Sequence, residues 1–265
     1  MTLQLLPNRT SALRAERLEF LRFCSDLSRL EWSASSNADG WRIQDVVAHL
    51  GSGCHSLFTP SAMTMLFSKD IERTNDTMVQ ARRSWEPKRV LDEYARWSAR
   101  VTRLSGAAGA SPLARIRMPL AELGSFPLGL LLGGAMVFDQ HTHLRFDMAP
   151  AIGRAAPPTD ANRMSVVIEW MLAVLSNQLR QTLPAWMHLP VSLTLTGPGG
   201  GAWWIAADGA ITPGPAPEPT GADIVATAEQ FPEWATRRAP WRERSVTVGG
   251  DHEYGERFLD AMNVV

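Results

Sequence analysis

The hydrophobic pattern of the chain changes in character beyond the proline-rich stretch GRAAPPTDAN, residues 153–162. Before this stretch, apolar residues recur at the spacing of amphipathic helices. After it, VSLTLTG and GAWWIAADG alternate with the period of two that is typical of strands. The change therefore predicts an α+β protein with two domains, residues 1–155 and 156–265.

The first domain contains four helical patterns with long connections between them. Residues 10–30 set leucines among charged residues, and WRIQDVVAHLGSGCHSLF has a second apolar stripe that Gly51 and Gly53 weaken. A third helix begins at Pro87, which suits a first helical turn. A fourth is expected in PLGLLLGGAMVFDQHTHLRFDM. Such a pattern favours a four-helix bundle with its functional site between the helices.

The second domain mixes helical and strand patterns. SVVIEWMLAVLSNQLRQTL predicts a buried helix, and the two strands that follow are joined by the glycine-rich turn GPGG. ADIVATAEQFPEWATRRAPW combines a short strand with a helix, SVTVGGD is a further strand, and YGERFLDAM is a last helix. We expect a small α/β domain.

Composition restricts the class of partner. The net charge over 265 residues is −1, so no basic field favours nucleic acid. Cys24 and Cys54 are the only cysteines, which supports neither a disulfide framework nor a zinc knuckle and indicates a reduced, cytoplasmic protein. Because no segment fits a signal peptide or a membrane span, we expect neither secretion nor membrane insertion. We expect a monomer or homodimer that acts on small molecules.

The stretch FDQHTHLRFD sets carboxylates and imidazoles along one predicted helix. Asp139, His143 and Asp147 follow at intervals of four residues and share a helix face, whereas His141 points roughly the other way. A carboxylate and an imidazole one turn apart can hold the same metal ion. Such a pair also occurs without metal, on a surface or satisfied in a core, so the spacing alone leaves both interpretations open.

A third metal ligand must come from another helix. His49 is the candidate, because it lies in VVAHL near the buried side of the second helix, where an imidazole needs a partner. Two imidazole nitrogens and one carboxylate oxygen leave an open position for water or a thiolate, which is the arrangement of a catalytic zinc.

Three other patterns contain residue types that can carry chemistry. Cys54 stands beside His55, but adjacent residues on a helix diverge, so Cys54 fits better as a small core residue than as a nucleophile. GPGGG lacks the Lys-Ser/Thr ending of a phosphate loop and fits a hairpin turn. Arg237 and Arg238 suit a substrate carboxylate and a solvated basic segment equally well.

Several segments together resemble one known family. WRIQDVVAHL is similar to the signature W-x-V-x-D-V-V-x-H-L, Asn75 in ERTNDTMVQARR to an asparagine of the next connection, and DQHTHLRFDMAPAIG to a carboxylate-x-x-x-His pair before F-D. These are features of the mycothiol-dependent maleylpyruvate isomerase family, within a DinB-like group of metal-binding four-helix bundles. VSLTLTGPGGGAWWI, WATRRAP and VTVGGDHEYGERFLDAM resemble its sterol-carrier-like second domain. The resemblance covers nearly the whole chain.

The resemblance implies a divalent metal, usually zinc, held by His49, Asp139 and His143, with mycothiol as cosubstrate. The metal would lower the pKa of the thiol, so that a thiolate attacks a small electrophile. In the isomerase, thiolate addition to a cis double bond permits rotation, and elimination returns the trans isomer. Other members of the family transfer the thiol to electrophiles.

The resemblance also implies roles outside the metal ligands. Asn75 would bind the cofactor, and Arg237 or Arg238 would be the arginine that such enzymes use for substrate or thiol. An enzyme that activates water instead of a thiol is a further option. The alternative of a different class is a non-catalytic protein of the same fold that binds a small apolar or acidic ligand.

The chain departs from the family pattern at the metal ligands. Asp139 stands where the family usually has Glu, which is one methylene longer. The interval from His143 to Asp147 is four residues where three are usual, and an alignment on F-D would put Gln140 and Leu144 in the ligand places. Asp139 and His143 are preferred because they keep ligand chemistry and the one-turn relationship.

Overall fold

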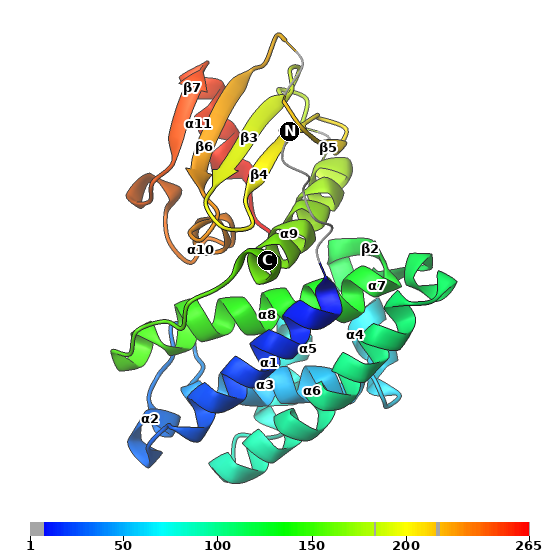
Figure 1. Cartoon of the computed structure of the whole chain (residues 1–265), viewed down its shortest axis with the longest axis vertical. Coiled ribbons are helices and arrows are strands. Elements are labelled where there is room, and N and C mark those ends of the chain that lie inside the picture. Colours follow the sequence, from blue (N-terminus) through cyan, green and yellow to red (C-terminus); the bar gives the residue numbers. More distant parts are fainter. Residues whose placement is uncertain (1–7, 183, 216–217, 265) are drawn as a thin grey trace. The chain divides into compact units, whose positions relative to one another are not determined.

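The computed structural model describes residues 8–182, 184–215 and 218–264. The chain divides into two compact units, Met1–Pro158 and Thr159–Val265. The first unit is mainly helical and the second contains a five-stranded sheet, so the predicted α+β class is confirmed (Figure 1). Among the described residues, no helix combines the length and apolar character that crossing a membrane requires.

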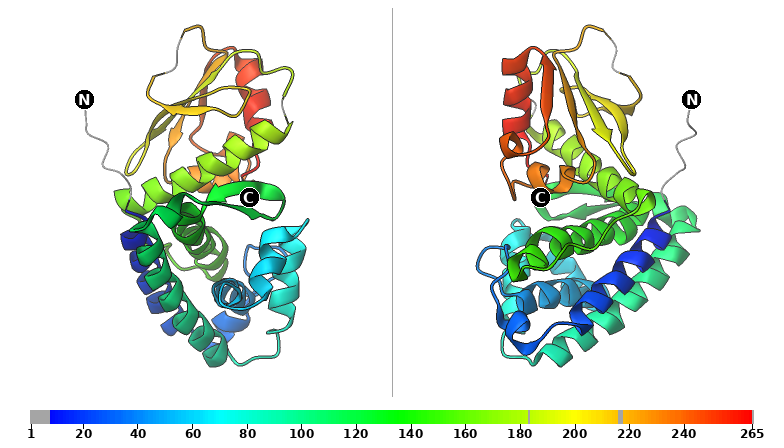
Figure 2. Two further views of the ribbon diagram at one scale, coloured as in Figure 1. Left: turned by 90° about the vertical axis from the view of Figure 1, so that its right-hand side faces the viewer. Right: turned by 60° about the vertical axis from the view of Figure 1, so that its left-hand side comes forward.

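The predicted bundle helices are present in the first unit. The fourth helix is continuous and includes two wider, π-helical stretches, η3 and η4. Figure 2 shows α1 and α6 side by side along the bundle. The bounds are α1 (Arg9–Ser25), α3 (Ile43–Ser56), α6 (Pro87–Gly109) and, in the fourth helix, α7 (Leu128–Leu130), η3 (Leu131–Ala135), α8 (Met136–Thr142) and η4 (His143–Met148).

The prediction of a single helix over residues 10–30 is wrong, because a second short helix, α2 (Arg29–Ser33), follows α1. Ser28 Oγ accepts a hydrogen bond from the Glu31 backbone N–H at 3.3 Å, and the Ser28 backbone N–H donates to Glu31 Oε2 at 2.7 Å. This reciprocal capping box begins a new helix and turns the chain after α1.

The connections contain elements that the sequence patterns did not predict. Two helices lie between α3 and α6, and an antiparallel hairpin lies between α6 and the fourth helix. Asp70 caps the second of these helices, since its carboxylate accepts from the Arg73 backbone N–H at 2.9 Å. The bounds are α4 (Ser61–Phe67), α5 (Ile71–Gln80), η1 (Pro112–Arg115), β1 (Arg117–Leu120), η2 (Ala121–Leu123), β2 (Gly124–Pro127) and η5 (Pro150–Ile152).

Helices α1, α3, α6 and η4 share one apolar core. Its fully buried side chains come from all of these elements and include Phe20, Val47, Tyr94 and Leu144. Helix α3 is the central one, because every residue from Ile43 to Ser56 except His55 is buried.

Gly51 explains how α3 and α6 lie so close together. A Cβ at this position would stand 3.2 Å from the backbone N of Tyr94 and 3.3 Å from its Cα. These are backbone atoms of α6, which cannot move aside as a flexible side chain would. The glycine that weakens α3 as an isolated helix therefore permits the packing of α3 against α6.

The second unit is built on one five-stranded sheet of order β5-β4-β3-β6-β7, in which β3 and β6 are parallel and the other neighbours are antiparallel. The GPGG turn joins β3 to β4 as predicted. Strand β5 was not predicted. The bounds are α9 (Ala161–Thr182), β3 (Val191–Thr196), β4 (Gly201–Ile205), β5 (Ile211–Pro213), β6 (Ala222–Thr227), α10 (Phe231–Ala235), η6 (Trp241–Glu243), β7 (Thr247–Gly250) and α11 (His252–Ala261).

Replacing Gly51 by alanine should lower the free energy of unfolding by about 1–3 kcal/mol, because the added methyl group presses on the Tyr94 backbone. Gly109→Ala is the matched control: it lies at the exposed end of α6, where a Cβ would meet nothing within 4 Å. There the higher helix propensity of alanine should stabilise slightly. Urea unfolding measures both variants, and equal stabilisation by both would contradict the close packing at Gly51.

Candidate metal centre

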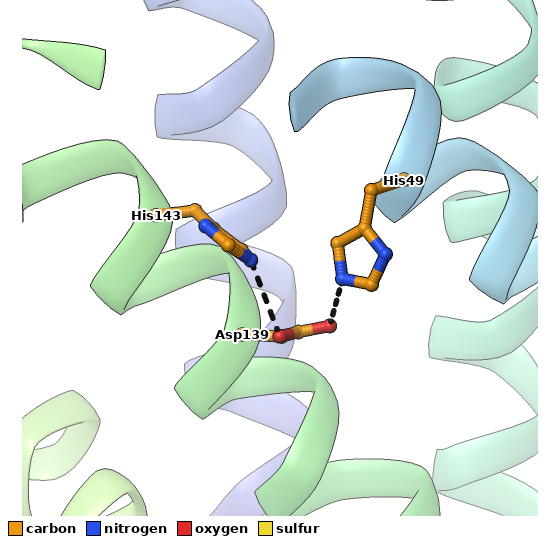
Figure 3. A group of neighbouring side chains, drawn as sticks. All are labelled: His49, Asp139 and His143. Atoms are coloured by element: carbon orange, nitrogen blue, oxygen red, sulfur yellow. Dashed lines mark ion pairs between the residues drawn. The ribbon is translucent and has the colours of Figure 1, made fainter. Parts of the chain in front are cut away.

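His49 of α3 and Asp139 and His143 of the fourth helix come together in the first unit (Figure 3). One ligand atom from each lies within 4.8 Å of the other two. Asp139 Oδ2 is 3.3 Å from His49 Nε2, and Asp139 Oδ1 is 3.6 Å from His143 Nε2. The side chains of His49 and His143 are 7% and 10% exposed and that of Asp139 is 30% exposed, so the group opens on the carboxylate side.

These distances fit a metal ion. Two ligand atoms of a tetrahedral zinc site lie about 3.4 Å apart when each bond is about 2.1 Å long. The separations of 3.3 Å and 3.6 Å are close to that edge length. Asp139 reaches both imidazoles with its two oxygens, although its side chain is one methylene shorter than that of Glu. The donor set is two nitrogens and a carboxylate, which suits zinc and related divalent ions.

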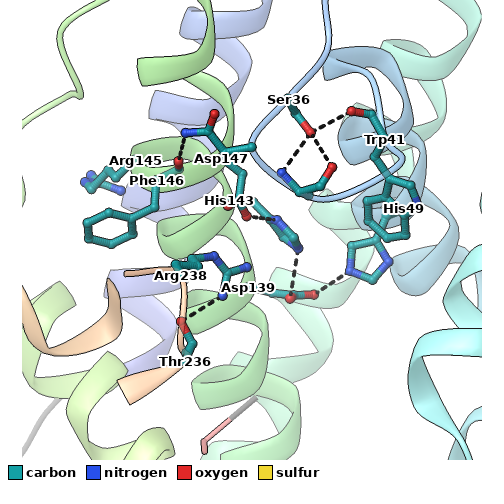
Figure 4. Close-up of polar contacts among 12 residues, drawn as sticks. Ser36, Trp41, His49, Asp139, His143, Arg145, Phe146, Asp147, Thr236 and Arg238 are labelled. Carbon is teal, nitrogen blue, oxygen red and sulfur yellow. Dashed lines mark hydrogen bonds and ion pairs between the residues drawn. The ribbon is translucent and has the colours of Figure 1, made fainter. Parts of the chain in front are cut away.

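His143 is oriented by Asp147, one turn further along the same helix face (Figure 4). His143 Nδ1 lies 2.7 Å from Asp147 Oδ2, and the Asp147 side chain is 1% exposed. Because an ionised carboxylate only accepts hydrogen bonds, the proton belongs on Nδ1, and the lone pair of Nε2 faces Asp139. Metal-binding histidines are commonly held in this way.

The wider turn of η4 begins at His143. The Ala149 backbone N–H donates to the Leu144 carbonyl, five residues back, at 3.1 Å. The loop before α3 is attached to this turn: the Asn37 backbone N–H donates to the Asp147 carbonyl at 2.9 Å and Asn37 Nδ2 to the Phe146 carbonyl at 2.8 Å. These two hydrogen bonds fix the loop before α3 against the fourth helix.

The same loop brings Trp41 against both imidazoles, which the sequence did not assign to the site. Its ring centroid is 5.1 Å from that of His49 and 6.3 Å from that of His143. The indole N–H donates to Asp76 Oδ1 at 2.8 Å, and the Ser36 hydroxyl donates to the Trp41 carbonyl at 2.8 Å. The tryptophan that opens WRIQDVVAHL was the available signal, but its side chain direction depends on the loop.

Helix α3 begins at an ion pair between Arg42, which is partly exposed, and Asp45, which is buried. Arg42 Nε and Nη2 donate to the two oxygens of Asp45 at 3.0 Å and 2.9 Å, and the Arg42 backbone N–H donates to the same carboxylate at 3.0 Å. Burial acts to raise the pKa of Asp45, but these hydrogen bonds outweigh it and hold the pKa below its usual value.

Two polar atoms near α3 and α5 are buried without a hydrogen-bond partner. They are His49 Nδ1 and Asn75 Oδ1. Figure 3 shows Nδ1 of His49 on the side of the ring turned away from Asp139. Buried polar atoms are nearly always paired, so each of these positions calls for a water molecule or a ligand atom. Asn75, predicted to bind the cofactor, lies on α5, a helix that packs against α3.

Cys54 is a core residue with an unreactive thiol. Its side chain is 2% exposed, burial raises its pKa to about 12, and the Asp139 carboxylate adds to this shift. His55 instead pairs with Glu93, whose Oε1 lies 2.8 Å from His55 Nδ1, and stacks on Trp97 at a centroid distance of 4.2 Å. The sequence-based preference for Cys54 as a packing residue agrees with this environment.

Arg237 and Arg238 lie in the second unit, after α10. Arg237 donates to the carbonyls of Met262 and Asp260 at 3.2 Å and 3.1 Å, at the end of α11. Its guanidinium thus stabilises a helix C-terminus, where carbonyls need donors. Arg238 Nη1 donates to Thr236 Oγ1 at 2.9 Å.

Comparisons with known proteins give a family-model match for the N-terminal part of the chain and a fold for nearly all of it. Residues 13–124 match the family model described as mycothiol maleylpyruvate isomerase N-terminal domain. The chain is similar to the crystal structure of a mycothiol-dependent maleylpyruvate isomerase, with 15% identity and a TM-score of 0.52. It is also similar to a histidine-to-alanine mutant of such an isomerase, with 14% identity and a TM-score of 0.54. Each match covers 91% of this chain and 91% of the other, and at these identities it establishes the fold. A search of curated proteins gives no significant match.

Both cysteines should be inert to Ellman's reagent in the native protein at about pH 8, because burial raises the pKa of both thiols. In guanidinium chloride both should react. Absorbance of the released thiolate measures the reaction, and a fast-reacting thiol in the native protein would reopen the possibility of a nucleophilic Cys54.

Asp147→Ala should destabilise the protein by roughly 1–3 kcal/mol, because it leaves the buried Nδ1–H of His143 without its acceptor. Asp147→Asn should lower the free energy of unfolding by less, since an amide oxygen can still accept a hydrogen bond from Nδ1–H of His143. Urea unfolding of the two variants measures the difference. Equal losses would mean that Asp147 does not act through this hydrogen bond.

Proposed function

Because residues 13–124 match the model of the mycothiol maleylpyruvate isomerase N-terminal domain, we propose that the chain is a metal- and mycothiol-dependent enzyme of this family that acts on a small electrophile. The reaction proposed is cis–trans isomerisation of the maleylpyruvate type, with transfer of the thiol to an electrophile as the alternative outcome of the same attack. The observation that supports it best is the convergence of His49, Asp139 and His143 at metal-ligand spacing.

His49, Asp139 and His143 would hold a divalent metal, with zinc the ion best suited to this donor set. When bound, the metal supplies the acidity that converts a coordinated thiol to a thiolate at neutral pH. Asp147 keeps the lone pair of His143 Nε2 directed at the site. Trp41 packs against His49 and lies near His143, and so contributes an apolar side to the site.

The exposed edge of the site is the side from which reactants would approach. Asp139 is the most exposed of the three donors, so the open position of the site is assigned to its side. Asn75 Oδ1 would accept an N–H or O–H of the thiol cosubstrate, which would satisfy an otherwise unpartnered buried oxygen. Arg237 or Arg238 is proposed for a substrate carboxylate, because a guanidinium can bind a carboxylate with two parallel hydrogen bonds.

The isomerisation conserves atoms and electrons without a further reactant. The thiolate sulfur forms a bond to one carbon of the cis double bond, and the π electrons move onto the conjugated carbonyl oxygen. Rotation follows about the bond that is now single. The electrons then return, the carbon–sulfur bond breaks, and the trans isomer and the thiolate are released. In the transfer alternative, protonation of the adduct retains the carbon–sulfur bond.

Protein purified without chelators should contain about one divalent ion per chain, and His49→Ala and His143→Ala should lose it because two donors do not suffice. His252→Ala, at an exposed position in the second unit, is the matched control and should keep the metal. Elemental analysis of the purified proteins measures the metal content.

The same variants separate the enzyme from a simple binder. With mycothiol and maleylpyruvate, the wild type should turn over, and the two histidine variants should lose about 100-fold or more in kcat/KM. A wild type that binds no metal and gives no thiol-dependent turnover would refute the proposed function and favour a non-catalytic binding protein.

A further inference from the structure

Gly53 is a buried glycine with empty space beside it. It lies inside α3, in the buried part of that helix, yet a Cβ built on it would meet no atom within 4 Å. Gly51, two residues earlier on the same helix, is the opposite case, since its Cβ would meet the Tyr94 backbone at 3.2 Å. Two neighbouring buried glycines therefore have different reasons for being there.

Neither the backbone nor the packing requires a glycine at this position. Gly53 has none of the positive φ angles that favour glycine, and no neighbour approaches its Cα closely enough to exclude a methyl group. Glycine inside a helix is less stable than alanine, and an unfilled space forfeits dispersion contacts. The glycine and the space are thus unfavourable for folding alone, which points to a use of the space.

The space lies next to the candidate metal centre. Gly53 follows His49 by four residues, so both are on the same face of α3. Because Cα–Cβ bonds tilt toward the N-terminus of a helix, the side chain missing from Gly53 would project over the turn that carries His49.

The turn that follows Gly53 carries uncharged groups. Ser56 Oγ donates to the Gly53 carbonyl at 2.7 Å, and Met65 Sδ lies 2.6 Å from the same oxygen, which brings the α4 methionine to this end of α3. A methionine and a satisfied hydroxyl favour a small uncharged group over an ionised one.

A second, independent observation concerns a polar atom of His49, one turn before Gly53. His49 is 6% exposed and its Nδ1 has no hydrogen-bond partner. The carbonyl or hydroxyl oxygen of a bound molecule would satisfy an N–H at this atom. The same ring thus directs Nε2 to Asp139 and leaves Nδ1 for a second contact.

We propose that Gly53 forms the wall of a ligand subsite beside His49, in which a small uncharged group of the thiol or of the electrophile is held. The missing side chain sets the size of that group. This inference rests on the proposed function, because it assigns the subsite to a reactant of the same site.

The test uses the zinc-loaded full-length protein with Gly53→Ala and Gly53→Leu, and Gly109→Ala as the control for a glycine-to-alanine change in open space. One arm measures the Kd of mycothiol alone by calorimetry. The other measures KM for maleylpyruvate at saturating mycothiol. The two arms identify which reactant occupies the subsite.

Gly53→Ala should raise Tm by about 2–4 °C, because alanine favours the helix and meets no clash. It should nevertheless raise either the Kd of mycothiol or the KM for maleylpyruvate by about tenfold. Gly53→Leu should raise the same constant further, since each added group occupies space that the ligand needs. The zinc content of the variants should remain that of the wild type. Gly109→Ala should change neither Kd nor KM.

Kd and KM within twofold of wild type in Gly53→Ala would overturn the subsite, and so would a lower Tm, which would mean that the space does not exist. A wild type that neither binds mycothiol nor turns over would refute the proposed function and the subsite with it. A wild type that binds mycothiol and turns over, together with Gly53 variants of unchanged Kd and KM, would refute the subsite alone.

Discussion

The burial of α3 on every side is the constraint from which the first unit follows. All of its residues except His55 are buried, so neighbouring elements surround the helix. Each of these contacts restricts which residue can stand at the contact position. Where α6 crosses, Gly51 removes the side chain that would strike Tyr94. Where the fourth helix faces it, His49 meets Asp139. A buried imidazole needs a partner, and here that partner is a carboxylate shared with a second imidazole.

The two imidazoles of the site are prepared differently. His143 has its Nδ1 held by a buried carboxylate, so its ring and tautomer are fixed before any ligand arrives. His49 is packed by Trp41 but keeps Nδ1 without a partner. The site thus combines one rigid donor with one whose second nitrogen remains available to a bound molecule.

Local sequence patterns were sufficient to predict the elements that have strong hydrophobic periodicity or a clear helix-start residue. Pro87 marks the start of α6, and the apolar stripe of the second helix predicts α3 despite its glycines. The one-turn spacing of Asp139 and His143 places them on one face because that relationship is local. His49 was proposed as their partner from its buried position in VVAHL and then from the family resemblance, because no local rule relates residues of two different helices.

What the sequence did not reveal depends on tertiary contacts. Helices α4 and α5 are short, and their stability comes from packing and caps that a periodicity search does not see. The π-helical turns of the fourth helix have no sequence signature of their own. Trp41 reaches the imidazoles only because a loop is tied to η4 by Asn37. Gly51 and Gly53 look alike in the sequence, and only their neighbours distinguish close packing from open space.

X-ray absorption at the zinc edge tests the central claim most directly, because it identifies the atoms around the metal. The account predicts two imidazole nitrogens and one or two oxygens at about 2.0–2.1 Å, with no sulfur in protein free of added thiol. Sulfur ligands from Cys24 or Cys54, or a spectrum without imidazole scattering, would contradict the assignment of His49, Asp139 and His143 as the metal centre.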